Sequence, residues 1–283
     1  MTAALFVLAL STAQPARDTT FVVPEGIRIA ISHREGDVHV TGIGGREVRV
    51  LLEDREGGVR VRSEGATFHV GARDRGNDGD IFVWVPEDVD VSVTGREGDI
   101  TVAGVARGAV EVRTADGDVE VDGAARVDVA ALDGEVRLAN TGPSVVNVAD
   151  GDVWIDRARG EATVHGIDAD IVITNADARA VSVTAVDGNI WYDGAVHEGG
   201  SYSLSTHDGD VTFALPEGVG ARISVATFDG ELVPSFPVQF RGGRLRGGEF
   251  TVGDGSAAIA LNSFDGDILL IRPGERVPDW DDE

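Results

Sequence analysis

Residues 116–155 of the chain read DGDVEVDGAARVDVAALDGEVRLANTGPSVVNVADGDVWI. The stretch holds three acidic-glycine-acidic triplets, and each is followed at once by a short alternating run of apolar and polar residues, at 119–121, 136–138 and 153–155. Strict alternation predicts a strand with one buried face, and an Asp-Gly pair is typical of a tight turn. The stretch therefore predicts turn and strand units that repeat.

The triplet recurs along the whole chain. The copies, two of them degenerate, are Glu35-Gly36-Asp37, Asp78-Gly79-Asp80, Glu97-Gly98-Asp99, Asp116-Gly117-Asp118, Asp133-Gly134-Glu135, Asp150-Gly151-Asp152, Asp168-Ala169-Asp170, Asp187-Gly188-Asn189, Asp208-Gly209-Asp210, Asp229-Gly230-Glu231 and Asp265-Gly266-Asp267. From position 79 to 230 the central residues step by 19, 19, 17, 17, 18, 19, 21 and 21. A fixed period of this size is the signature of a solenoid. We interpret the final step of 36 as two periods with one copy lost.

Each repeat also contains a second alternating run, for example at 127–129, 146–148, 181–183 and 223–225. A repeat is thus strand, variable loop, strand and tight turn, with no room for a helix. Parallel stacking of such rungs would bury the valine and isoleucine columns. We predict an all-β, parallel β-helix-like solenoid with rungs of about 17–21 residues. An antiparallel sandwich is the alternative.

Composition excludes several classes of function. The 283 residues include 49 acidic and 24 basic side chains, a formal net charge of −25, and no cysteine. Nucleic acids and anionic membrane surfaces would be repelled, so neither is expected as a partner. Without cysteine there is no disulfide framework, cysteine zinc site or thiol nucleophile. A hydrophobic content of 42% is too high for a disordered acidic tail.

The expected organisation has four parts. Residues 1–16 read as a signal peptide, because a short apolar run from Thr2 to Ala13 precedes small residues and is too short to span a bilayer. A buried first strand is the alternative. Residues 17–95 form irregular rungs or a capping β region, 96–272 the regular repeats, and 273–283 a polar acidic tail. The mature chain is expected in the periplasm, outside the cell or on its surface, without inserting into a membrane.

A second phrase recurs before some triplets, as Val23-Pro24-Glu25-Gly26-Ile27, Val85-Pro86-Glu87-Asp88-Val89 and Leu215-Pro216-Glu217-Gly218-Val219. This phrase, an alternating strand and repeated G-D-V-x-V units behind a signal peptide resemble the DUF4097 family of β-strand-repeat proteins, called "putative adhesins". The resemblance covers about residues 20–272. It implies a right-handed β-solenoid in bacterial envelope proteins, with no established catalytic residues to transfer.

The triplet carboxylates have two interpretations. As turn residues they would accept local amide hydrogens while glycine takes the left-handed conformation. As stacked charges they would favour a divalent cation, although the nonapeptide of calcium-binding β-rolls is absent. We expect no cofactor, and a structural Ca²⁺ stays open. An unchanged melting temperature in millimolar calcium would exclude the ion.

Two tryptophans are the candidate ligand-binding residues. If Val119 and Val121 point inward, Glu120 points outward, and so do its equivalents Arg137, Trp154, Val172, Trp191 and Thr212. Trp154 and Trp191 would then lie two rungs apart on one exposed face. Exposed aromatic rings on a flat sheet commonly receive sugar rings or a protein partner.

Catalysis has little support. The six histidines are scattered, and neither an H-E-x-x-H nor a G-x-S-x-G motif occurs. Every repeat carries the same carboxylates, whereas an active site should break the repeat at one place. We expect a non-enzymatic envelope protein with adhesin-like binding of a surface or glycan. A structural or regulatory protein that docks a protein partner is second, and a carbohydrate-active enzyme on a β-helix is third.

Overall fold

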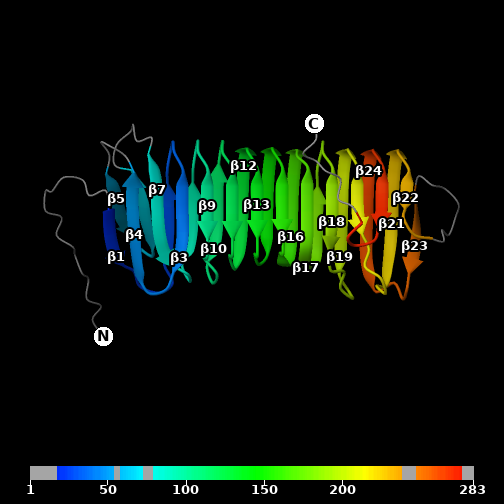
Figure 1. Cartoon of the computed structure of the whole chain (residues 1–283), viewed down its shortest axis with the longest axis horizontal. Helices are drawn as coiled ribbons and strands as arrows, with labels where there is room; N and C mark the ends of the chain where they lie inside the picture. The colour runs from blue at the N-terminus through cyan, green and yellow to red at the C-terminus, as the bar shows by residue number, and fades with distance from the viewer. Residues whose placement is uncertain (1–17, 54–57, 73–78, 238–246, 276–283) are drawn as a thin grey trace.

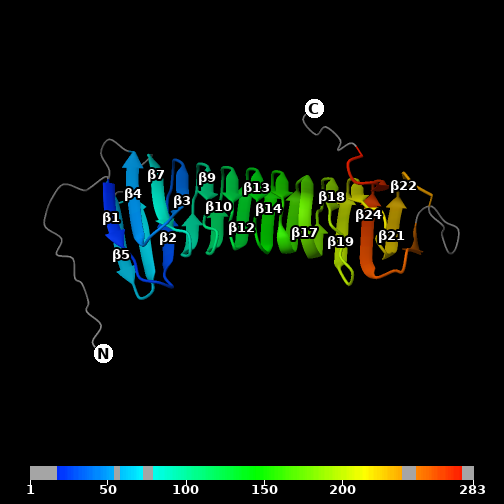
Figure 2. The same cartoon turned by 60° about the horizontal axis from the view of Figure 1, so that its bottom comes forward.

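The structure, a computed structural model, describes residues 18–53, 58–72, 79–237 and 247–275. In these residues all regular elements are strands, and none is a helix that could cross a membrane. The strands lie side by side across a long rod (Figure 1), and a tilted view shows them in two layers (Figure 2). Residues 1–16, predicted as a signal peptide, and most of the tail 273–283 lie outside the described residues.

One layer, sheet A, has its strands in a spatial order that differs from chain order at both ends. The order is β1 (Asp18–Val22), β4 (Glu47–Glu53), β7 (Asp80–Pro86), β3 (Val38–Ile43), β9 (Ile100–Ala103), β11 (Val119–Asp122), β13 (Val136–Ala139), β15 (Val153–Asp156), β17 (Ile171–Thr184), β18 (Ile190–Gly194), β20 (Val211–Ala214), β25 (Ile268–Ile271) and β22 (Leu232–Pro234).

The other layer, sheet B, contains the second strand of each rung. Its order is β5 (Val59–Glu64), β6 (Thr67–Ala72), β2 (Arg28–Ser32), β8 (Asp90–Thr94), β10 (Ala109–Thr114), β12 (Arg126–Asp133), β14 (Ser144–Asp150), β16 (Arg159–Asp168), the second half of β17, β19 (Ser201–Asp208), β24 (Ala257–Asp265), β21 (Ala221–Asp229) and β23 (Gly247–Val252). The long strand β17 passes from sheet A into sheet B.

In the central part of the rod, each strand pairs in parallel with the equivalent strands of the rungs before and after. Val119 of β11, for example, lies opposite Ile100 of β9 and Val136 of β13. Successive residues point to opposite faces, so valine, isoleucine and leucine from both sheets meet between the layers in one continuous core. The predicted all-β, solenoid-like stacking is confirmed. The antiparallel sandwich is wrong for these strands.

Both ends of the rod depart from chain order in the same way. At the N-terminal end, the rung β2–β3 lies between the rungs β6–β7 and β8–β9. At the C-terminal end, the rung β24–β25 lies between β19–β20 and β21–β22 (Figure 1). These two rungs are therefore paired on both sides, and neither forms an end of the rod.

Antiparallel strands complete the ends. In sheet A, β4 pairs with β7 and β1 with β4; in sheet B, β5 pairs with β6 and β23 with β21. A solenoid needs atypical terminal elements, because a regular end rung would leave its core and its backbone groups open. The interpretation of the 36-residue step as a lost copy is wrong. That step contains the cap strand β23 and the return to the inserted rung.

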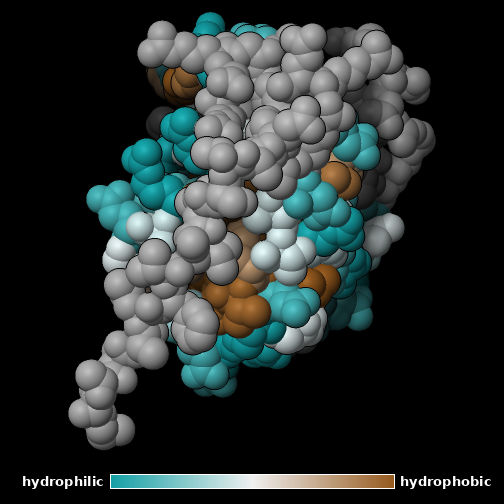
Figure 3. Space-filling model, turned by 90° about the vertical axis from the view of Figure 1, so that its left-hand side faces the viewer, coloured by the Kyte–Doolittle hydropathy of each residue, from teal (hydrophilic) through white to brown (hydrophobic). Residues whose placement is uncertain are grey.

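Aromatic side chains close the interior at the N-terminal end. Phe21 of β1 and Phe68 of β6 stack with ring centroids 5.4 Å apart and pack against the core while remaining partly exposed. Seen end-on, the described surface there is mostly hydrophilic, with a few apolar islands (Figure 3). This end is therefore covered by strands and rings together.

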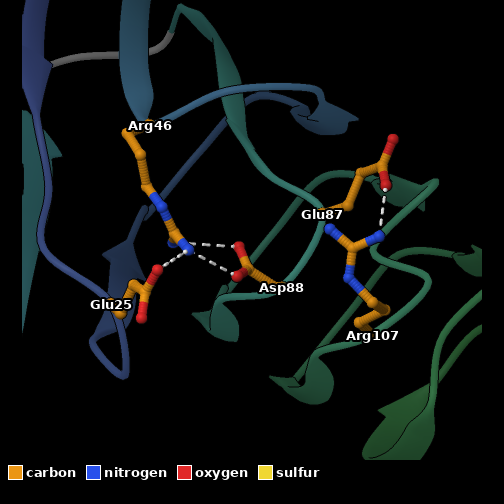
Figure 4. A network of polar contacts seen from close by, with 5 residues as sticks. All are labelled: Glu25, Arg46, Glu87, Asp88 and Arg107. Carbon is orange, nitrogen blue, oxygen red and sulfur yellow. Dashed lines mark hydrogen bonds and ion pairs between the residues drawn. The ribbon is translucent and has the colours of Figure 1, made fainter.

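The Pro-Glu phrases lie in loops and are held by arginines. The Arg46 guanidinium donates to Glu25 at 3.0 Å and to both carboxylate oxygens of Asp88 at 3.1 and 2.8 Å, so it joins two copies of the phrase (Figure 4). Arg107 donates in the same way to Glu87 at 3.1 Å. Ion pairs that are partly or fully exposed, as these are, add little stability singly, but here they fix loops from different rungs against each other.

Candidate functional site

The triplets form one edge of the rod, where strands of sheet B turn into strands of sheet A. Their central residues stack so closely that a Cβ on Gly134 would lie 2.5 Å from the carbonyl oxygen of Gly117. Gly134 also has a φ of +114°, which side-chain-bearing residues rarely adopt. Ala169 is the one described centre that is not glycine, and it does not have a positive φ. At Gly134, therefore, both the positive φ and the close stacking require glycine.

The third residues of the triplets form a ladder of hydrogen bonds along the same edge. The Asp99 carboxylate accepts from the backbone N–H of Asp118 at 3.0 Å, and the Asp118 carboxylate accepts from that of Glu135 at 2.9 Å. Asn189 continues the ladder, because its amide oxygen accepts from the N–H of Asp210 at 2.9 Å. For these residues the expectation of bonds within one turn is wrong, since the bonds join neighbouring rungs.

First- and third-position carboxylates line a groove of about 450 Å³ on this edge. Burial raises the pKa of Asp170 in the groove, and the nearby charges of Asp152 and Asp168 act in the same direction. Within the described ranges, no group of three or more His, Asp or Glu side chains has an arrangement that could hold a metal ion. Calcium binding therefore stays a prediction without a site assigned to it.

In most described rungs the residue two positions before a triplet is buried and lies against the turn. Thr206, Thr227 and Ser263 occupy this position in three rungs, and each hydroxyl donates to a stacked glycine carbonyl at 2.8–3.1 Å. The first rung has His33 there, buried and without a well-formed hydrogen bond to its ring nitrogens in the described structure. Burial lowers the pKa of His33, opposed by the backbone of Gly79 and by Asp80 and Asp37 nearby.

We expect His33 to make stability depend on pH. Because its pKa is lower in the folded state, the unfolded chain takes up the proton first, so this contribution is complete above about pH 6.5 and is lost as the pH falls below it. The variant His33→Thr places at this position the residue that other rungs have there. Between pH 7.5 and 5, the slope of its unfolding free energy against pH, measured by urea unfolding, should be smaller than that of the wild type by up to about 1.4 kcal/mol per pH unit. The exposed His165→Thr is the control. Identical slopes for wild type and His33→Thr would contradict the role of this side chain.

The predicted outward column of sheet A is present in register. Glu120, Arg137, Trp154, Val172, Trp191 and Thr212 lie opposite one another in successive strands. The first three are exposed, as expected, and Trp154 is 37% exposed. The expectation of exposure is wrong for Val172, Trp191 and Thr212, which are buried.

Trp191 belongs to a small apolar cluster on the outside of sheet A. It is 2% exposed and packs with Val172, Ala214 and Ile271, and Leu269 joins the cluster at its edge. The chain after β25 turns back to this region, where the Gly274 amide donates to the Asp193 carboxylate at 3.3 Å. In this structure Trp191 is therefore a packing residue and offers no ring face to a ligand.

Trp154 lies in a shallow groove of about 240 Å³. Its lining combines the indole with hydrogen-bonding groups of Glu120, Arg137, Asp156 and Thr174. Asp156 is already held in place, since it accepts from the Thr174 hydroxyl at 3.1 Å and from the Asn175 amide at 2.8 Å. An aromatic face beside fixed polar groups can receive a ring that is apolar on one side and hydroxylated at its rim.

One further position repeats along the rod, the residue directly before each triplet, and it was not among the predicted site residues. Several of these residues are large, apolar and exposed, namely Leu132, Ile167, Val186, Phe228 and Phe264. The signal was present in the sequence, because an apolar residue adjoins an acidic turn at the end of an alternating strand. It was missed because alternation alone assigns such residues to an outward face without showing that they align.

Comparisons with known proteins agree with this class of fold, a β-solenoid-like repeat protein. The sequence matches the family described as Toastrack DUF4097 over residues 25–166 and 145–270. The chain belongs to this family, as the repeats and the Pro-Glu phrases predicted. No curated protein matches it.

Similar solved structures carry names from cell adhesion. A "putative adhesin" from Bacteroides fragilis shares 14% identity, with 92% of this chain and 100% of that chain covered and a TM-score of 0.35. One from Parabacteroides merdae shares 11%, covering 90% and 95%, with a TM-score of 0.34. A "putative cell adhesion protein" from Clostridium sporogenes shares 10%, covering 90% and 98%, with a TM-score of 0.30. Similarity this low carries no conclusion about activity.

Proposed function

We propose that this protein is an exported, non-enzymatic envelope protein that binds a glycan of a surface or of the envelope through the groove at Trp154. In this proposal residues 1–16 are removed on export, and the mature solenoid winds to the right with rungs of about 17–21 residues. It needs no cofactor. The single observation that carries the binding role is the exposed indole of Trp154 among the polar groups of Glu120, Arg137 and Asp156.

The chemistry of the groove favours a carbohydrate. Sugar rings have an apolar face that packs on an indole and hydroxyls that bond to carboxylates and guanidinium groups. Arg137 also forms an ion pair with Glu135. On binding, a sugar hydroxyl can take the place of Glu135 as a partner of the guanidinium. A net charge of −25 makes anionic polymers such as nucleic acid poor competitors for the same surface.

The test is binding to immobilised, purified bacterial envelope polysaccharides by biolayer interferometry. Trp154→Ala should weaken binding at least about tenfold, which corresponds to about 1.4 kcal/mol. Trp84→Ala is the matched control, because Trp84 also lies on sheet A but is partly covered by the Arg49 guanidinium 5.0 Å from its ring. Equal binding of wild type and Trp154→Ala would overturn the proposal, as would an equal loss in both variants.

A further inference from the structure

Exposed apolar side chains line the rod directly beside the triplet edge. The first residues of the triplets pair rung by rung, from Asp133 at one end to Asp265 and Asp229 at the other. The residues before them are therefore aligned as well. They form what we call the apolar column, in spatial order Leu132, Ala149, Ile167, Val186, His207, Phe264 and Phe228.

The apolar column exposes a large side chain in most of its rungs. Leu132 is 63% exposed, Ile167 58% and Val186 50%. At the C-terminal end the rings stack, with centroids 4.7 Å apart for His207 and Phe264 and 4.8 Å apart for Phe264 and Phe228. Single exposed apolar residues are normal on protein surfaces, whereas a contiguous row marks an interaction site.

The apolar column has a notch near its N-terminal end. The small side chain of Ala149 lies between the larger ones of Leu132 and Ile167, and a groove of about 460 Å³ opens between these two. Its floor includes the buried Val148 and Gly166 of sheet B. A leucine-sized side chain from a partner could enter this notch and contact apolar groups on several sides.

Charge differs sharply between the two sides of the apolar column. On the side of the turns lies a row of exposed aspartates, Asp133, Asp150, Asp168, Asp187, Asp208 and Asp265. On the other side the outward residue next to the apolar column carries no carboxylate in six rungs, namely Ala130, Asn147, His165, Thr184, Ser205 and Asn262. Asp128 and Glu161 lie farther along their strands, away from the apolar column. A partner that fits this surface is apolar in the middle and positively charged along one flank.

We propose that the apolar column and its aspartate row bind a cationic amphipathic α-helix of a partner protein. Rungs repeat about every 4.8 Å, and a helix presents its apolar stripe about every 5.4 Å. An extended strand repeats its side chains only about every 6.7 Å and fits less well. Seven rungs span about 29 Å, the length of roughly 19 helical residues.

The charge of the surface disfavours other occupants. A second copy of the chain would place its own aspartate row against this one, and like charges in contact oppose association. An anionic lipid surface would be repelled for the same reason. The apolar column borders sheet B and the Trp154 groove lies on sheet A, so each proposal can fail without the other.

The test uses a fluorescent 19-residue helical peptide with leucines on one stripe and lysines beside it, measured by anisotropy. Ile167→Glu and Val186→Glu should each weaken binding at least about tenfold. Both side chains are exposed, so the fold should persist, and thermal melting checks this. Each change adds negative charge, which would strengthen purely electrostatic binding. Val145→Glu, outward on the same sheet but away from the apolar column, is the matched control and should bind as wild type.

Four results would overturn the proposal. One is unchanged binding in both column variants. Another is equal binding of a peptide of the same composition with its leucines spread around the helix. A third is a dimer in sedimentation that Val186→Glu abolishes, which would assign the surface to a second copy. The fourth is column-dependent binding to phosphatidylglycerol vesicles, which would assign it to a membrane.

Discussion

Gly134→Ala is expected to lower the free energy of unfolding by about 3 kcal/mol or more. The new Cβ would lie 2.5 Å from the carbonyl oxygen of Gly117, and the residue would have to keep a φ of +114°. Neither problem relaxes locally, because Gly117 and Gly134 both belong to the stack that fixes rung spacing. Urea unfolding followed by circular dichroism measures the change.

Gly45→Ala separates the two causes. Gly45 has a similar φ of +103°, but no atom lies within 4 Å of where its Cβ would be. This variant should lose only the backbone strain, about 1–2 kcal/mol. If Gly134→Ala and Gly45→Ala cost the same, the close stacking of the triplet edge would not contribute to stability.

Leu261→Asp should unfold the C-terminal end of the rod beyond β20. Leu261 is fully buried in β24, and an unpaired carboxylate there costs roughly 3–5 kcal/mol or more. β24 pairs with β19 on one side and β21 on the other, so its loss also removes the one parallel partner that β21 has among the described strands. Because solenoid stability is mainly a sum over neighbouring rungs, the central rungs should remain folded.

Hydrogen exchange with mass spectrometry locates the damage. Peptides from β21 and β24 should both lose protection, while peptides from β11 to β15 keep theirs. If the rungs followed chain order, β21 would pair with β19 and stay protected, so that outcome would contradict the inserted rung. Ala258→Asp, exposed on the same strand, is the control and should leave exchange unchanged.

The regular rungs were predictable from the sequence because one local rule repeats. Each triplet supplies the turn, and each alternating run supplies one strand with a buried face. The register between neighbouring strands follows, because equivalent residues of successive rungs lie opposite one another. The ends were not predictable in this way. Nothing local in 28–43 or 257–271 shows that these strands insert between later or earlier rungs, because that choice depends on which edges are left open.

The candidate site was predictable in part for the same reason. Alternation correctly placed Trp154 and Trp191 on the outward side of sheet A, two rungs apart. Alternation could not show that Ala214 and Ile271 would pack around Trp191. This burial comes from neighbouring strands and from the chain that returns after β25, and not from the two-residue period within one strand. The apolar column was hidden because alignment across rungs, not sequence within one rung, makes it continuous.

The most direct test of glycan binding at Trp154 is an NMR titration of the tryptophan indole N–H signals with the polysaccharide bound best in interferometry. The chain has four tryptophans, so single Trp→Phe variants assign each signal. We predict that the Trp154 signal shifts on binding and that the signal of the buried Trp191 does not. A Trp154 signal unmoved at saturating polysaccharide would contradict binding at this groove.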